Sequence, residues 1–164
     1  MDTSSLVNTV VRQLLTPLCE PVHPAWIDGN TTPLATSAAV LELSDGGLVM
    51  LAPCEVYLDS DKYPSLGLSL EKCDPGALQW IRNGKTYSMS PFAGAAGLLP
   101  FPVAQVVESD PLGEGALSEV LLIGPLGQLL FRHIMPPMSL GIEVTQSGQA
   151  PNKSFKPMPL RGTA

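Results

Sequence analysis

The chain has 164 residues, of which 45% are hydrophobic and only 15% are charged. This balance is typical of a folded protein and excludes an intrinsically disordered chain. A formal net charge of −6 argues against nucleic-acid binding, because phosphate groups are bound by Lys and Arg. The 17 prolines and 15 glycines favour short strands and loops over long helices.

The charges divide the chain into two regions. All acidic residues lie before residue 145, whereas the last 20 residues carry only cations, at Lys153, Lys156 and Arg161. We expect residues 1–144 to form a single globular domain and residues 145–164 to form a flexible basic tail. An acidic body favours a basic protein partner, or simply keeps the protein soluble.

The cysteines and the chain start bear on localisation. Three cysteines cannot all pair with one another, and the first residues lack the basic and apolar regions of a signal peptide. No apolar run approaches the length of a membrane span. We therefore expect a cytoplasmic protein with free thiols, no membrane association and no cofactor.

The first predicted element is an N-terminal helix. A polar residue such as Asp2 can cap it, and Pro17 would end it near Thr16. The apolar residues recur at helical spacing, so we expect this stripe to pack on a sheet. They are Leu6, Val7, Val10, Val11, Leu14 and Leu15.

Residues 18–33 are proline-rich and are expected to be irregular. Cys19 and His23 have a spacing that metal ligands use, but no second pair of ligands lies nearby in the sequence. No metal site is therefore expected here.

Strands and tight turns are expected to follow. Residues 37–43 and 48–52 are apolar runs on either side of a Gly-Gly turn, and residues 66–70 form another short run. Asn83-Gly84 predicts a type I′ hairpin between residues 78–81 and 85–89. Residues 103–108 predict one further strand.

The most strongly patterned stretch runs from Leu117 to Val144. Two apolar runs flank a Gly/Pro turn and a third run follows Pro136-Pro137, which predicts three strands of a meander. The run from Val120 to Ile123 is apolar throughout and is expected near the middle of the sheet. The sequence thus predicts an α+β fold, with the N-terminal helix packed on a mainly antiparallel β-meander sheet or a partly open barrel.

Two parts of the chain resemble each other, namely residues 36–70 and residues 116–144. Each has a hairpin pattern, a loop and a Ser-Leu-Gly strand, at Ser65–Leu70 and at Ser139–Val144. Two explanations stay open: an internal duplication, or two meanders that share the general pattern of meanders.

No catalytic motif is present in the sequence. There is no Gly-x-Ser-x-Gly elbow, no His-Glu-x-x-His and no phosphate-binding glycine loop. The candidate nucleophile and base are Cys54 and His133, and a cysteine-dependent enzyme using both is one alternative. His133 lies within a predicted strand and is expected to be structural.

The preferred interpretation is a small, acidic, non-catalytic protein-binding module, similar in manner to an inhibitor, immunity protein or chaperone. Loops on a rigid sheet are where binding residues concentrate, and a basic partner would be attracted to the acidic loops. The other alternative is a structural subunit of a larger assembly. The predicted partner-binding residues are Asp59, Asp61, Asp110, Glu114, Trp80, Tyr87 and Phe92.

Overall fold

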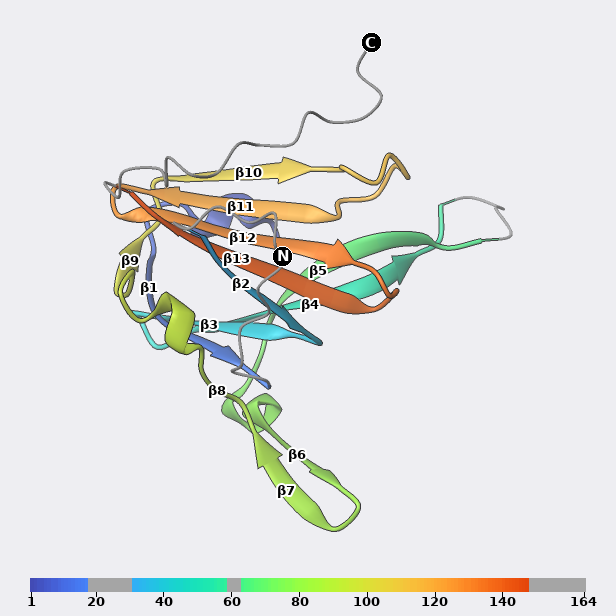
Figure 1. Ribbon diagram of the computed structural model, residues 1–164, viewed down its shortest axis with the longest axis horizontal. Helices are drawn as coiled ribbons and strands as arrows, with labels where there is room; N and C mark the ends of the chain where they lie inside the picture. Colours follow the sequence, from blue (N-terminus) through green and yellow to red (C-terminus); the bar gives the residue numbers. More distant parts are fainter. Residues whose placement is uncertain (18–30, 59–62, 148–164) are drawn as a thin grey trace, which may run out of the picture.

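The computed structural model describes residues 1–17, 31–58 and 63–147 (Figure 1). Their regular structure is mostly β-strand, as the sequence indicates, and the helical turns are short 3-10 segments. The predicted α+β class with an N-terminal helix is wrong, because the described chain contains no α-helix. The 3-10 segments are Thr3–Leu6 (η1), Pro75–Leu78 (η2) and Ala93–Ala95 (η3).

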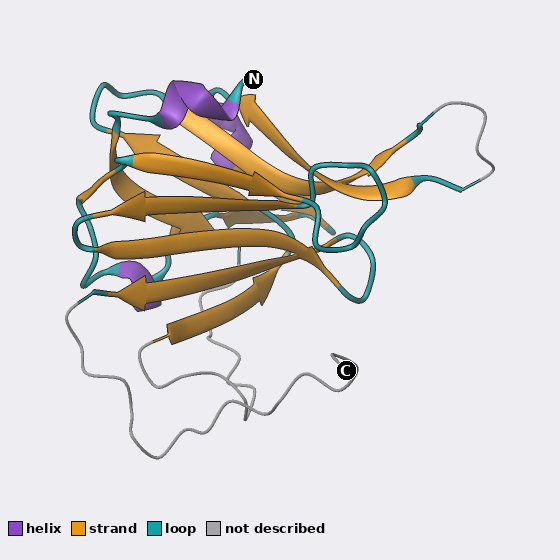
Figure 2. Ribbon diagram, turned by 90° about the horizontal axis from the view of Figure 1, so that it is seen from above, coloured by secondary structure: helices purple, strands orange, loops and turns teal. Residues whose placement is uncertain are grey.

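The strands form two stacked sheets (Figures 1 and 2). Sheet A has the order β5-β4-β3-β1-β8, and β9 also pairs with β1. All its neighbouring strands are antiparallel. Its strands are β1 (Val10–Thr16), β3 (Ala39–Leu43), β4 (Leu48–Val56), β5 (Ser65–Lys72), β8 (Ser90–Pro91) and β9 (Phe101–Pro102).

Sheet B is an antiparallel sheet of order β10-β11-β12-β13-β2. The predicted meander is confirmed, but its first strand is second in the order and β12 is central. Leu121 and Ile123 are only half-buried, so β11 is fully covered on one face. The strands are β10 (Gln105–Ser109), β11 (Glu119–Gly124), β12 (Gly127–Ile134), β13 (Ser139–Gln146) and β2 (Thr31–Thr36).

One hydrophobic core lies between the two sheets. Leu41 and Leu51 enter it from sheet A, Phe131 and Ile142 enter it from sheet B, and all four are fully buried. Complete burial of such a side chain contributes roughly 1.5–3 kcal/mol, so this contact between sheets is the main stabilising term. The architecture is therefore a β-sandwich.

The predicted helix fails because of a β-bulge in β1. Val11 pairs with Leu43 while Gln13 pairs with Glu42, so one extra residue is inserted between the two pairs. The insertion reverses the alternation of side chains, and Val11 and Leu14 both reach the core although they lie three residues apart. A bulged strand thus reproduces the spacing of an amphipathic helix.

Strand β2 includes residues that were expected to be irregular. It is the edge strand of sheet B, where Pro33 lies opposite Glu143. A proline has no N–H to donate to a neighbouring strand. An edge strand has a partner on one side only, so a proline there need not break the hydrogen-bond ladder. Strand β13 runs through Gln146, two residues beyond the expected domain end, and residues 148–164 of the expected tail lie outside the described residues.

The two similar parts of the sequence each supply three consecutive antiparallel strands, β3–β5 to sheet A and β11–β13 to sheet B. The third strand begins in the same register in both, since Ser65 pairs with Val56 and Ser139 pairs with Ile134. An internal duplication stays a prediction, because a shared meander register is also common to unrelated sheets.

A separate hairpin projects from the sandwich, at the bottom of Figure 1. It consists of β6 (Gln79–Arg82) and β7 (Lys85–Ser88), which form a two-stranded sheet. Asn83 and Gly84 have φ angles of 52° and 73°, as a type I′ turn requires. The predicted Asn-Gly hairpin is therefore confirmed.

Gly127, the first residue of β12 after the turn from β11, allows a test of the packing of the sandwich. At Gly127 φ is 154°, and an added Cβ atom would lie 2.1 Å from the carbonyl oxygen of Thr145. We expect Gly127→Ala to lower the free energy of unfolding by at least about 2 kcal/mol, as overpacking does. Urea denaturation measures this. The control is Gly76→Ala, where nothing lies within 4 Å; an equal loss in both variants would contradict the packing.

Candidate functional site

Three strand connections meet at one end of the sandwich, on the right in Figures 1 and 2. They are the β4–β5 connection (57–64), of which 59–62 are not described, the β10–β11 connection (110–118) and the β12–β13 connection (135–138). We call this end of the molecule the loop end. It contains both acidic stretches from which binding residues were predicted.

The β10–β11 connection covers the outer edge of β5. The Leu66 N–H donates to Glu114 Oε2 at 2.6 Å, and the Leu68 N–H donates to the carbonyl oxygen of Leu117 at 2.7 Å. The Ser65 hydroxyl donates to the Glu114 carbonyl oxygen at 3.0 Å. An edge strand without such partners would be open to pairing with another chain. The acidic loop therefore closes sheet A.

Asp110 fixes the shape of the same connection. Its carboxylate accepts hydrogen bonds from the backbone N–H groups of Glu114 at 3.2 Å and Gly115 at 2.7 Å. Short polar side chains commonly stabilise turns in this way. Gly115 also lies beside Leu58 of the β4–β5 connection, since an added Cβ atom would stand 3.2 Å from Leu58 Cδ1. Two of the three connections are thus in direct contact.

His133 joins the β12–β13 connection to strand β5 of the other sheet. The side chain is only 3% exposed. Its Nε2 accepts a hydrogen bond from the Met138 N–H at 2.8 Å, so the proton is on Nδ1, which donates to the Gly67 carbonyl oxygen at 2.8 Å. One imidazole ring therefore links sheet B, β5 of sheet A and the β12–β13 connection.

This geometry gives no support to catalysis by Cys54 and His133. Both ring nitrogens of His133 already have backbone partners, so neither is available to take a proton from a thiol. Burial, and secondarily the Glu71 carboxylate, raise the pKa of the Cys54 thiol. A nucleophilic cysteine needs the opposite shift, toward the thiolate.

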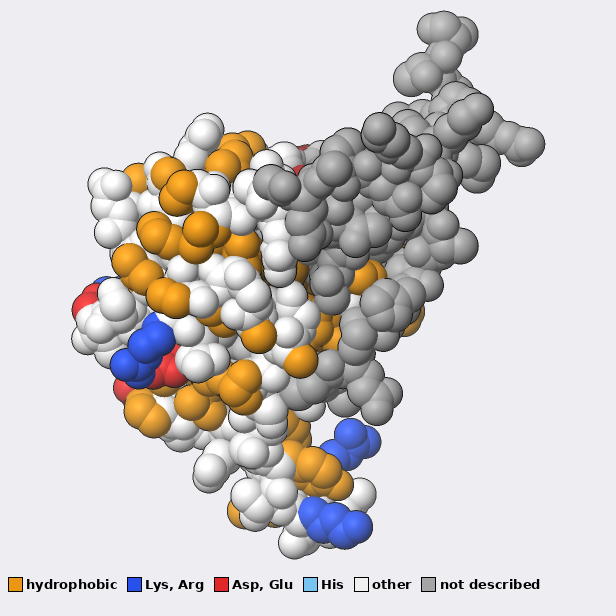
Figure 3. All heavy atoms as spheres, turned by 60° about the vertical axis from the view of Figure 1, so that its left-hand side comes forward, with side chains coloured by type: hydrophobic (Ala, Val, Ile, Leu, Met, Phe, Trp, Pro, Cys, Tyr) orange, Lys and Arg blue, Asp and Glu red, His pale blue; other side chains and the backbone are white. Residues whose placement is uncertain are grey.

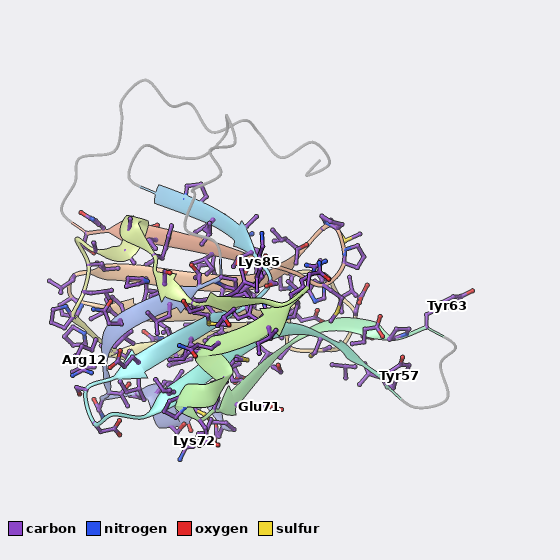
Figure 4. The ribbon with its side chains drawn as sticks, turned by 90° about the horizontal axis from the view of Figure 1, so that it is seen from below. Arg12, Tyr57, Tyr63, Glu71, Lys72 and Lys85 are labelled. Atoms are coloured by element: carbon purple, nitrogen blue, oxygen red, sulfur yellow. The ribbon has the colours of Figure 1, made fainter. Side chains whose placement is uncertain are left out.

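Large apolar side chains are exposed on this rigid frame. Tyr57 is 68% exposed, Tyr63 is 83% exposed and Met135 is 67% exposed. Figure 4 shows both tyrosines far out on the β4–β5 arm. Tyrosine gives a large contact area at low entropic cost, and methionine adapts to irregular surfaces, so both are typical of binding surfaces. Leu112 and Met138 add further exposed apolar area at the same end.

The predicted binding residues fall in four places. Asp110 and Glu114 lie at the loop end, whereas Trp80 and Tyr87 lie on the projecting hairpin. Phe92 is 1% exposed and packs in the core, so its prediction as a partner contact is wrong. The stretch around Phe92 is apolar and Gly-rich, and its backbone N–H donates to the Leu14 carbonyl oxygen of β1 while the ring packs in the core. Asp59 and Asp61 lie outside the described residues.

Sequence reasoning missed the exposed tyrosines and methionines. In the β4–β5 and β10–β11 connections, the predicted binding residues are all acidic, and no apolar residue of the loop end is among them. The available signal was position: Tyr57, Tyr63, Met135 and Met138 all lie between strand patterns, and the last three each adjoin a proline.

A metal site and a membrane-spanning helix are both absent from the described residues. No group of three or more His, Cys, Asp or Glu side chains there could hold a metal ion. Within the same residues, no helix is long and apolar enough to cross a membrane. Comparisons of the chain with protein-family models, with curated proteins and with solved structures find no match.

The role of Glu114 can be tested with two substitutions. Glu114→Ala removes the acceptor of the Leu66 N–H and should lower the free energy of unfolding by about 1 kcal/mol. Glu114→Gln retains a carbonyl acceptor and should stay within about 0.5 kcal/mol of wild type. Thermal or urea unfolding compares them. If the Gln variant loses as much as the Ala variant, the charge rather than the hydrogen bond matters.

The Cys54 thiol should react slowly. Since its pKa is raised, less thiolate is present at neutral pH, and alkylation by iodoacetamide should be slower than that of glutathione. The rise of its rate with pH should occur at higher pH than for glutathione. Peptide mapping by mass spectrometry separates Cys54 from the other thiols. Faster alkylation than glutathione at pH 7 would restore the cysteine-enzyme hypothesis.

Proposed function

We propose that this protein is a non-catalytic protein-binding module that holds a protein partner at the loop end. The observation that carries the proposal is the combination of exposed Tyr57, Tyr63 and Met135 with two neighbouring connections that are hydrogen-bonded to β5 and to His133. Such a role is typical of inhibitors, immunity proteins and chaperones, which act by covering a surface.

The frame under these side chains supports tight binding. Association is opposed by the entropy lost when loops become ordered at an interface. Here the 110–118 and 135–138 connections are already fixed, the first by Asp110 and Glu114 and the second by His133. Less ordering is left to occur on binding, so more of the contact energy contributes to affinity.

The charges at this end favour a basic partner. Glu55 lies beside Tyr57, whose hydroxyl donates to its carboxylate at 3.2 Å, and Asp110 and Glu114 are in the neighbouring connection. Carboxylates at the rim of an interface mainly raise the association rate, and the effect weakens over a Debye length of about 8 Å at physiological salt. The tyrosines and methionines would then supply most of the affinity.

The test is site-specific photo-crosslinking in native lysate. A benzophenone side chain is placed at Tyr63, and at Leu126 as the control, because Leu126 is exposed at the opposite end of the sandwich. We expect a partner to be captured from Tyr63 and not from Leu126. The captured protein is then purified, and its affinity is measured directly by calorimetry.

Variants connect that affinity to the named residues. Tyr57→Ser with Tyr63→Ser should weaken binding by about tenfold or more, whereas Leu126→Ser should leave it unchanged. Asp110→Asn with Glu114→Gln should slow association at low salt and have little effect at high salt. The proposal is abandoned if no partner is captured from Tyr63, or if the double-tyrosine variant binds like wild type.

A further inference from the structure

The projecting hairpin has one chemically distinct face. Trp80 lies opposite Tyr87 and Arg82 lies opposite Lys85 in the β6–β7 register. Since side chains alternate along a strand, these four residues share a face, and Gln79, Ile81, Thr86 and Ser88 share the other. A hollow lined by Trp80, Arg82 and Tyr87, together with Pro17 and Ser37, independently places the first set on the same side.

The two rings on this face form one apolar platform. Trp80 and Tyr87 stack with centroids 5.9 Å apart and planes 16° from parallel. The pair lies outside the core, and Tyr87 is 43% exposed. Trp, Tyr and Arg are the residue types that most often dominate the energetics of protein interfaces. All three occur here on one short ribbon.

The two cations beside the platform repel each other. Arg82 and Lys85 are directly opposite, and like charges in that position destabilise a hairpin. Among the described residues, neither forms an ion pair with a carboxylate, whereas Arg12 and Arg132 do. The face of the hairpin visible in Figure 3 shows cationic and apolar side chains and no carboxylate. An anionic ligand would relieve this repulsion.

The backbone of the hairpin also has unused pairing capacity. Neither β6 nor β7 pairs with any other described strand. Outer edges of this kind present N–H and C=O groups to which an extended peptide can add as a third strand. A two-stranded ribbon is marginally stable by itself, so a third strand would also stabilise it.

We propose that the β6–β7 hairpin binds an extended acidic segment of a protein partner, which adds as a third strand. An apolar side chain of that segment contacts the Trp80–Tyr87 platform, and carboxylates two and four residues further along contact Arg82 and Lys85. The period of two along a strand brings the apolar and acidic positions onto the same face. This site is separate from the loop end, which projects in a different direction in Figure 1.

A short acidic segment fits this face better than a nucleic acid. The hairpin contributes two cations and no acid to a chain whose net charge is −6, so the remainder of the molecule is more acidic than the whole. A long phosphate backbone would leave the hairpin and meet that acidic surface, where it would be repelled. A short peptide with two carboxylates does not extend beyond Arg82 and Lys85, so it does not meet the acidic surface.

The test uses fluorescence anisotropy with defined peptides and the full chain. The probe is a labelled peptide containing Phe-Thr-Glu-Thr-Glu, and the comparison peptides replace both Glu by Lys or by Gln. A labelled oligothymidylate tests nucleic-acid binding. We expect saturable binding of the Glu peptide, no binding of the Lys peptide, and at least about tenfold weaker binding by the double variant Arg82→Glu with Lys85→Glu.

The matched control is Ile81→Ser. Ile81 is 76% exposed and belongs to the same ribbon, but its side chain lies on the opposite face, so this change should leave affinity unaltered. Trp80→Ala should weaken binding while circular dichroism shows the sandwich intact. Equal binding of Glu and Lys peptides, or of wild type and the charge-reversed variant, overturns the proposal; preference for the oligothymidylate also overturns it. None of these outcomes bears on binding at the loop end.

Discussion

The outer edge of β5 is the place on which the rest of this structure depends. The N–H groups of Leu66 and Leu68 at that edge are bonded to the β10–β11 connection, and the C=O of Gly67 between them is bonded to His133 of sheet B. Buried and edge backbone groups must find partners, and here the partners hold the two sheets together. The hydrophobic core supplies most of the stability, but it is non-directional. These hydrogen bonds fix how the sheets meet.

The same interactions hold the β10–β11 and β12–β13 connections in place. His133 is buried among apolar residues, which is costly for a polar ring unless both nitrogens are bonded, and both are. Glu114 has a comparable role on the surface. Carboxylates and an imidazole that resemble functional groups in the sequence therefore stabilise the fold, and the recognition proposed above relies on exposed apolar side chains instead. The hairpin differs, because its polar and aromatic groups have few internal partners.

Structural features that depend only on residues close together in the chain were predictable from the sequence. The Asn83-Gly84 turn depends only on which residues tolerate positive φ, and the alternating runs of the 117–144 meander depend only on the period of a strand. Both appear in the structure as expected. In contrast, the N-terminal strand was predicted as a helix, because the bulge between Val11 and Gln13 is visible only when the partner strand is known. The spacing of apolar residues indicates which residues are buried, but it does not show whether a helix or a bulged strand carries them.

The sequence by itself determined that this chain is rich in antiparallel strands, that it has an Asn-Gly hairpin and that two of its loops carry acidic residues. Only the tertiary structure decided which carboxylates are already engaged, that Phe92 is buried, and that Tyr57, Tyr63 and Met135 share one end of the molecule. The physical reason is that strand periodicity is encoded by neighbours two residues apart. Pairing across a sandwich joins residues such as Gly67 and His133, whose separation along the chain carries no local signal.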